Sequence, residues 1–160
     1  GGLGSFSLMC MILSFLELHP LLQLGLIQEE DNVAVLLLDF LELYSKHFNY
    51  DQVGLRLHPL SSYFERRSRD DWDHLKRVQP AQTSNTATTG LSIEDPQSPE
   101  NDLSRGSFQF SAVRQSLEHA FLVMTSRMSQ ADTRAMHIVE PLVWIPERTI
   151  RHRSFIDQQS

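Results

Sequence analysis

The stretch "VAVLLLDFLELYSKHF", residues 33–48, decides the fold class of this protein. Almost every position in it is apolar, and the charged exceptions are Asp39, Glu42 and Lys46. Because these three lie three and four residues apart, a helix places them on one narrow polar stripe. A helix that is otherwise apolar all round is buried among other elements. The stretch therefore predicts a helix that is mostly buried in the middle of a helical bundle.

Two further helices are predicted on either side of this one. In "GSFSLMCMILSFLELHP", residues 4–20, Ser5 is the expected N-cap after a glycine-rich entry, and Pro20 ends the apolar periodicity. Residues 21–31 predict a connection that ends in a second cap at Asp31-Asn32. Helical spacing over the third segment is marked by Phe110, Val113, Leu117, Ala120, Phe121, Met124 and Met128.

The pattern changes between these helices. Alternation of apolar residues from Val53 to Leu57 predicts a short strand. Residues 65–78 are charged, with Trp72 as their anchor, and residues 79–90 have the composition of a mobile loop. Residues 138–160 carry basic residues around apolar ones and predict a final helix. The predicted fold class is mainly α with a small β element.

Composition and charge exclude several classes of site. The chain has 160 residues, enough for one domain with a real core. Its net charge of -6 argues against holding nucleic acid by bulk electrostatics, which needs a basic surface. Cys10 is the only cysteine, which excludes internal disulfides and cysteine-rich zinc sites. No paired-histidine motif or Walker loop is present, and Glu17, His19 and Pro20 interrupt the apolar start too early for a membrane span.

Two segments leave alternatives open on pattern alone. A helix start preceded by glycines offers backbone N–H groups to phosphate, where Ser5 adds a hydroxyl and Phe6 a ring face for a base. The simpler interpretation, which pattern alone favours, is a capping serine and a core phenylalanine. Residues 93–105, "IEDPQSPENDLSR", are either a solvated loop or a segment tied down by a buried carboxylate at Asp95.

The order of three segments nevertheless resembles a known family. "GGLGSFSL", "LLLDFLELYSKHFNY" and "IEDPQSPENDLSRGSF" together are similar to the central, PAP-associated domain of non-canonical poly(A) polymerases, in particular the nuclear RNA-surveillance (TRAMP) type. These enzymes belong to the DNA polymerase beta-like nucleotidyltransferase superfamily. The resemblance implies a helical nucleotide-recognition domain over residues 1–128, with a variable mobile insertion around 58–90, and a truncated helical extension at 129–160.

The insertion is where the sequence departs from the family, which has a glycine-tyrosine turn followed by basic residues. Ser61, Ser62 and Tyr63 are interpreted as the remnant of that turn.

The resemblance also implies nucleotide-binding roles. Ser5 would contact the triphosphate, and Phe6, usually tyrosine in relatives, would stack on the base, an interaction of about 1–3 kcal/mol. Asn101 sits where adenylyltransferase relatives carry asparagine and uridylyltransferase relatives histidine, which favours adenine because an amide both donates and accepts. The opening of the recognition loop and its braces are matched by Glu94, Asp95, Pro96, Asp102 and Arg105.

The family's activity is the transfer of AMP from ATP to an RNA 3′ end. Three aspartates in a preceding catalytic domain hold two divalent metals, Mg²⁺ or Mn²⁺, and lysines there bind the triphosphate. This chain lacks that region, so none of its residues is assigned as catalytic or as a metal ligand. We therefore expect the nucleotide-recognition part of a larger two-domain enzyme, inactive by itself, whose first helix exposes an apolar face.

The family resemblance further implies a nuclear location without membrane association. The expected partners, besides ATP and RNA, are a zinc-knuckle RNA-binding protein and an exosome-associated helicase. Two alternatives stay open: an RNA uridylyltransferase, and a non-catalytic helical interaction module.

Overall fold

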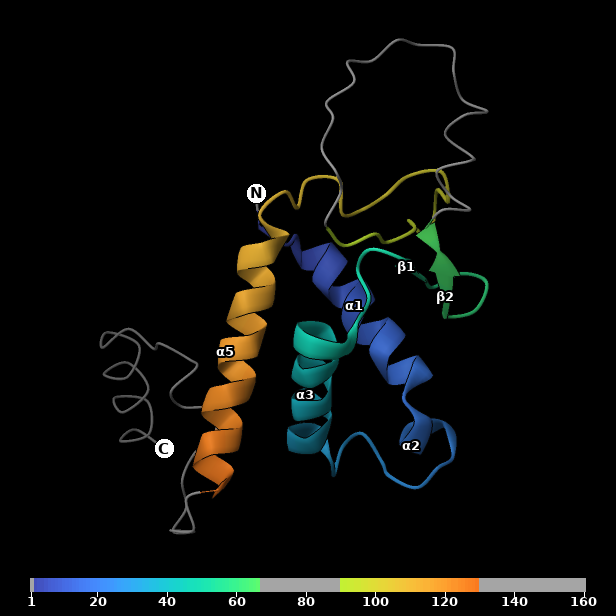
Figure 1. Cartoon of the computed structure of the whole chain (residues 1–160). Coiled ribbons are helices and arrows are strands. Elements are labelled where there is room, and N and C mark those ends of the chain that lie inside the picture. Colours follow the sequence, from blue (N-terminus) through green and yellow to red (C-terminus); the bar gives the residue numbers. More distant parts are fainter. Residues whose placement is uncertain (1, 67–89, 130–160) are drawn as a thin grey trace, which may run out of the picture. The chain divides into compact units, whose positions relative to one another are not determined.

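The computed structural model describes residues 2–66 and 90–129 (Figure 1). Backbone packing divides the chain into two compact units, Gly1–Glu118 and His119–Ser160, and the first unit holds every element discussed below except the second half of the last helix. The charged segment beyond residue 66, the loop at 79–89 and the final helix at 138–160 were predicted in parts of the chain outside the described residues. The domain boundary at residue 128 stays a prediction.

The first helix, α1, spans Ser5–Leu18 and begins differently from the prediction. Gly4, in extended conformation, is the N-cap, and its carbonyl accepts the first helical hydrogen bond from the Leu8 N–H at 2.9 Å. Ser5 is thus already helical and its hydroxyl caps nothing. The prediction of Ser5 as N-cap was wrong because glycine also accepts the extended N-cap conformation.

The end of α1 confirms the sequence signal. His19 is extended, as a residue before proline prefers to be, and the helix ends at Leu18. Pro20 then opens a single helical turn, α2 (Pro20–Gln23), inside the segment that was predicted as a plain connection. Proline suits this first position because its missing N–H would have no partner there.

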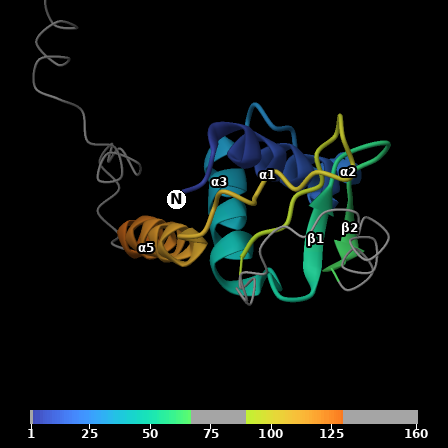
Figure 2. The same cartoon turned by 90° about the horizontal axis from the view of Figure 1, so that it is seen from above.

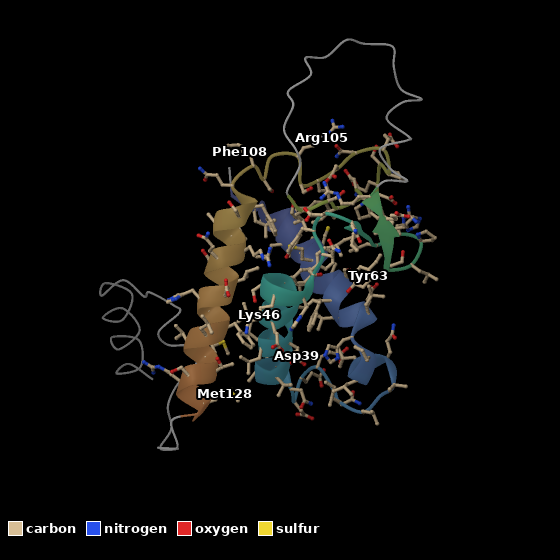
Figure 3. The ribbon with its side chains drawn as sticks, in the orientation of Figure 1. Asp39, Lys46, Tyr63, Arg105, Phe108 and Met128 are labelled. Carbon is tan, nitrogen blue, oxygen red and sulfur yellow. The ribbon has the colours of Figure 1, made fainter. Side chains whose placement is uncertain are left out.

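The central helix follows as α3 (Val33–Glu42) and continues into one π-helical turn, Leu43–His47. Asn32 is at the predicted cap position, yet its side-chain amide donates to the Gln28 carbonyl instead of capping the helix. The predicted polar stripe is present, since Asp39 and Lys46 lie along the same helical stretch in Figure 3 and both are at least partly exposed.

A chain of aromatic rings forms the core of the first unit. Ring centroids 4.8–5.5 Å apart join, in order, Phe15, Phe40, Tyr44, Phe48, Tyr50 and Phe110. The wholly buried Tyr44 donates its hydroxyl to the Met11 carbonyl of α1 at 3.2 Å, which gives its polar end a partner. The helix around residues 33–48 therefore contributes one face to this core. The prediction that it is mostly buried was only partly correct, because six of its sixteen residues are buried, five are intermediate and five are exposed.

The small β element is a two-stranded antiparallel hairpin. Strand β1 (Val53–Arg56) confirms the predicted strand, although it ends before Leu57, and it pairs with β2 (Ser62–Glu65). Figure 2 shows the two strands side by side. Since Ser62 and Tyr63 belong to β2, their interpretation as the remnant of a turn was wrong. The predicted insertion around 58–90 accordingly contains a paired strand near its start.

The last described helix, α5 (Phe110–Ser129), confirms the amphipathic helix predicted from residue 110 onward. Its first turns, up to Glu118, belong to the first unit. With three longer helices and one hairpin, the fold is mainly α with a small β element, as predicted. Within residues 2–66 and 90–129, the helices are too short or too polar to cross a membrane.

Much of α1 faces outward with apolar side chains. Five of them are more than a third exposed: Phe6, Leu8, Met9, Ile12 and Leu13. Together with α3, the same helix borders an apolar groove of about 450 Å³. Exposed apolar surface on the first helix was expected from the sequence and is present.

Candidate functional site

The segment 91–105 pairs with β1 in the manner of a third strand. The Leu55 N–H donates to the Ser92 carbonyl and the Glu94 N–H donates to the Leu55 carbonyl, both at 2.9 Å. Leu55 and Ile93 form a parallel bridge and are wholly buried. In Figure 2 the segment runs between α1 and β1. The interpretation of this stretch as a merely solvated loop was wrong, because its opening residues are part of the core.

Asp102 joins the two arms of this loop. Its Oδ1 accepts hydrogen bonds from the N–H groups of Ile93 and Ser104, and its Oδ2 accepts one from the Ser92 hydroxyl at 2.7 Å. The Ser104 hydroxyl also donates to Oδ1. Burial alone would raise the pKa of Asp102, but the hydrogen bonds from Ser104, Ser92 and Ile93 hold it below its ordinary value. The carboxylate is thus a structural brace of the loop.

The tip of the loop is ordered by Asp95. Its carboxylate accepts hydrogen bonds from the Gln97 N–H and from the side-chain amide of Asn101, each at 3.0 Å. The Asp95 N–H also donates to the Asn101 carbonyl at 3.1 Å. The hydrogen bond from Asn101, followed by that from Gln97, lowers the pKa of Asp95. Asp95 ties the loop from a solvent-accessible position, so the alternative of a buried carboxylate was wrong.

Asn101 and Pro96 lie at this ordered tip. Asn101 is exposed, and the hydrogen bond that its side-chain amide donates to Asp95 orients it. Pro96 is half-buried and stands in the turn between Asp95 and the Ser98 N–H, which donates to the Asp95 carbonyl at 3.2 Å. An oriented exposed amide is the arrangement that hydrogen-bond recognition of a base edge requires.

The loop opening is also held by a contact that the sequence reasoning missed. Arg56 of β1 donates from Nε and Nη2 to the two carboxylate oxygens of Glu94, at 2.9 and 3.0 Å. The hydrogen bonding of its guanidinium to the Glu94 carboxylate is the main cause that raises the pKa of Arg56. The two residues are 38 positions apart, and only the pairing of β1 with the loop brings them together. The alternation that predicted the strand contained Arg56, yet it carried no signal for its partner.

The N-terminal turns of α1 pack against the other arm of the loop. The Ser7 hydroxyl donates to the Leu103 carbonyl at 3.2 Å. Burial raises the pKa of the Cys10 thiol, and the nearby Asp95 carboxylate raises it further. Ser5 and Phe6, directly before Ser7, therefore lie at the same end of the first unit as the loop at 91–105.

Both of these residues are exposed, and Phe6 retains 44% of its accessible surface. The simpler interpretation, a capping serine and a core phenylalanine, was therefore wrong on both counts. The structure brings together the two segments that were predicted to bind nucleotide and leaves Ser5, Phe6 and Asn101 exposed.

Arg105 differs from its expected role. Its N–H donates to the Asp102 carbonyl at 3.3 Å, but its side chain is exposed on the segment that leads toward Phe108 (Figure 3). Within residues 2–66 and 90–129 its guanidinium makes no hydrogen bond or ion pair. Of the two residues expected to brace the loop, Asp102 does so through its carboxylate and the Arg105 side chain does not.

The acidic residues of this site do not fit a metal centre. Among the described residues no cluster of three or more His, Cys, Asp or Glu could hold a metal ion. Asp95 and Asp102 already accept hydrogen bonds from within the loop, and Glu94 is paired with Arg56.

Comparison with known proteins agrees with this geometry. Residues 32–101, which run from the central helix to the tip of the loop, match the family described as Cid1 family poly A polymerase. The solved structure described as "Structure and function of the polymerase core of TRAMP, a RNA surveillance complex" superposes with a TM-score of 0.76 and 31% identity, over 91% of this chain and 44% of that one. Residues 32–101 therefore carry the PAP-associated domain of this family.

Curated relatives extend the likeness over the PAP-associated domain. "Poly(A) RNA polymerase cid14" of Schizosaccharomyces pombe is 41% identical over 128 residues, which is 80% of this chain and 17% of that protein. "Inactive non-canonical poly(A) RNA polymerase protein Trf4-2" of Drosophila melanogaster is 26% identical over 157 residues, 98% of this chain and 36% of that protein. The chain thus spans well under half the length of the relatives it matches.

Proposed function

We propose that this PAP-associated domain recognises the nucleotide in an RNA 3′-end adenylyltransferase that acts in RNA surveillance and decay. The observation that supports this most directly is the packing of the first turns of α1 against the loop at 91–105, through Ser7 and Leu103. It places a helix N-terminus, an exposed aromatic ring and an oriented amide at one end of the first unit. A nucleoside triphosphate offers a phosphate, a ring and a base edge to these three groups.

Each group has a distinct role in this proposal. The first N–H groups of α1 and the Ser5 hydroxyl bind phosphate, since a helix N-terminus carries partial positive charge. Phe6 stacks on the base, and Asn101 hydrogen-bonds its edge. Asp102 and the Arg56–Glu94 pair keep the loop in place. Ser5, Phe6 and Asn101 thus bind and orient ATP and take no part in bond making.

The reaction itself joins the RNA 3′ oxygen to the α-phosphorus of ATP and releases pyrophosphate. Divalent metals, Mg²⁺ or Mn²⁺, activate the hydroxyl and neutralise the triphosphate in such transfers. They would be held by carboxylates in a catalytic domain of the longer protein, because the loop carboxylates here are occupied by hydrogen bonds.

The direct test is nucleotide incorporation by the longest natural form of the protein. A short RNA primer is incubated with Mg²⁺ or Mn²⁺ and each nucleoside triphosphate separately. We expect a ladder of products with ATP and little extension with the others. If a folded protein extends the primer with no nucleotide, the proposal is overturned in favour of a non-catalytic interaction module. The Drosophila relative, whose name describes it as inactive, makes this alternative worth testing.

The choice of base can be tested at Asn101. Replacing it by His (Asn101→His) puts at this position the residue type expected of uridylyltransferases and removes the amide that Asp95 orients. We expect the ratio of kcat/KM for ATP over UTP to fall by about tenfold, the cost of one lost hydrogen bond to the base. Asn49→His, at another exposed asparagine of the first unit, should leave the ratio unchanged. Preferential use of UTP by the unaltered protein would instead establish the uridylyltransferase alternative.

The likeness to the TRAMP polymerase core supports work within an RNA-surveillance assembly. On that basis we further propose a zinc-knuckle RNA-binding protein and an exosome-associated helicase as partners, and a nuclear location. Co-purification of the tagged natural protein tests the partners, and fluorescence microscopy of the same protein tests the location.

A further inference from the structure

Arg56 stands outside the residues that the family resemblance assigns to the nucleotide. It lies at the end of β1, and its guanidinium meets the Glu94 carboxylate with two parallel hydrogen bonds of 2.9 and 3.0 Å. The Glu94 side chain is only 11% exposed. A carboxylate so far removed from water needs a charged, hydrogen-bonded partner, and Arg56 supplies it with the geometry that only a guanidinium offers.

The hairpin holds Arg56 in place from its other side. Its guanidinium carbon lies 5.4 Å from the centroid of the Phe64 ring, within range of a cation–π contact. Phe64 sits opposite Gly54 in the β1–β2 register and covers it so closely that a Cβ there would be 2.2 Å from the ring. The Phe64 ring therefore lies close both to Gly54 and to the Arg56 guanidinium.

On the loop side, Glu94 is followed directly by the residue that orients Asn101. The Glu94 N–H donates to the Leu55 carbonyl, and Glu94 forms an antiparallel bridge with Asp102. Asp95, the next residue, accepts the side-chain amide of Asn101 at 3.0 Å. Hydrogen bonds thus fix both the backbone and the carboxylate of Glu94. Because Asp95 is the next residue, they also restrict the direction in which its backbone and side chain leave Glu94.

We propose that Arg56 is a positioning residue for base recognition, which acts through Glu94 and Asp95 to set the direction of the Asn101 amide. This proposal rests on the proposed function of the loop. In this proposal the β1–β2 hairpin positions the recognition loop. The selectivity for the base then depends on Arg56, a residue that does not contact the nucleotide.

The test compares Arg56→Lys with the unaltered protein in the longest natural form. A lysine keeps the charge but cannot make two parallel hydrogen bonds to one carboxylate. We expect KM for ATP to rise about tenfold and the preference for ATP over UTP to fall, with kcat changed less than about twofold, because the catalytic groups lie elsewhere. If Arg56→Lys does not fold, Glu94→Gln, which keeps the size of the side chain and removes its charge, serves the same purpose.

Arg114→Lys is the matched control. Arg114 also combines a hydrogen bond, to the Ser45 carbonyl at 2.8 Å, with a position 5.8 Å from the Tyr50 ring centroid, but it belongs to α5 and does not contact the loop. It should lower the melting temperature without changing KM or the ATP preference. An equal change of KM in both arginine variants would reduce the role of Arg56 to general stability and overturn the proposal.

A double-mutant cycle tests the route through Asn101. If Arg56 acts by directing that amide, Arg56→Lys should cost little further ATP preference once Asn101→Ala has removed it. Additive effects would overturn the proposed route. Failure of the inference is distinct from failure of the function: if the unaltered protein extends RNA with ATP and Arg56→Lys behaves like it, only the inference falls, whereas a protein that extends RNA with no nucleotide overturns both.

Discussion

At the scale of one residue, Phe6 is an apolar side chain that is only partly used in the packing of the core. It lies in a helix with a buried face, yet 44% of it remains exposed, next to Ser7, which donates to the Leu103 carbonyl of the loop at 91–105. Full burial of a phenylalanine contributes about 1.5–3 kcal/mol to stability, so a side chain left half outside contributes much less. The exposed part of the ring is available for the stacking contact that the proposed function requires.

Phe6→Ala should therefore raise KM for ATP by roughly tenfold in the longest natural form, because it removes base stacking of about 1–3 kcal/mol. The melting temperature should change little. Phe6→Tyr, which keeps the ring, should retain a normal KM. Met9→Ala, at a similarly exposed position of α1, is the control for a general effect on the helix. An unchanged KM in Phe6→Ala would refute the stacking role.

At the scale of elements, the site depends on three segments joined side by side: α1, the loop at 91–105, and the β1–β2 hairpin. The loop contributes hydrogen bonds to both neighbours, to Ser7 on one side and to Leu55 on the other. Neither neighbour is close to the loop in sequence. Disturbing the hairpin or the internal brace should thus reach the site without touching its exposed residues.

Gly54→Ala tests the hairpin. An added Cβ would lie 2.2 Å from the Phe64 ring, so the ring would have to move away from Arg56. We expect a loss of about 1–3 kcal/mol in the free energy of unfolding, measured by urea titration. Gly106→Ala, where nothing lies within 4 Å of the new atom, should be nearly neutral. A neutral Gly54→Ala would mean that the hairpin tolerates displacement of the ring.

The pH dependence of the loop tests Asp102. Its pKa in the folded protein is lower than the unfolded value of about 3.9, so ionised Asp102 stabilises the fold at neutral pH. This contribution is complete above about pH 4 and is lost as pH falls through the lower folded pKa. Asp102→Asn should cost about 1–3 kcal/mol at pH 7, and the difference from the unaltered protein should shrink toward pH 2.

Thermal melting between pH 7 and pH 2 measures this difference. Asp51→Asn, at an exposed aspartate outside the loop, gives the baseline for adding an amide elsewhere. A difference that stays constant over the whole pH range would show that the Asp102 carboxylate does not stabilise the loop through its charge.

At the scale of the whole molecule, the main feature is the apolar face of α1, which is exposed to solvent. Phe6, Leu8, Met9, Ile12 and Leu13 are each more than a third exposed, and an apolar groove of about 450 Å³ lies along the same helix. Large exposed apolar patches mark interaction surfaces. A domain that works beside a catalytic domain would cover such a face.

The 160-residue chain should therefore bind the dye ANS (8-anilinonaphthalene-1-sulfonate) strongly, and the longest natural form should bind much less per α1 helix. The comparison is made at equal molar concentration, with near-ultraviolet circular dichroism to verify that the aromatic core is packed. Replacing Met9 and Leu13 by glutamate in the 160-residue chain should also lower dye binding. Equal binding by both lengths would show that the face stays exposed in the longer protein.

The sequence by itself determined the three longer helices, the first strand and the family resemblance. Periodicity located α3 and α5, Pro20 located the end of α1, and the order of three motifs identified the domain, because each of these signals is local and survives without knowledge of the fold. The N-cap was missed because glycine and serine both suit it. The partner strand β2 was missed because its residues resembled a turn.

Only the tertiary structure decided which residues work together. Arg56 and Glu94 are 38 positions apart, and Ser7 and Leu103 are 96 apart, so no spacing rule connects them. The exposure of Phe6 and the solvent-accessible position of Asp95 likewise depend on which neighbours pack against them. Helical periodicity is encoded over three or four residues, whereas a binding site is assembled by hydrogen bonds and burial between distant segments, which only the folded chain specifies.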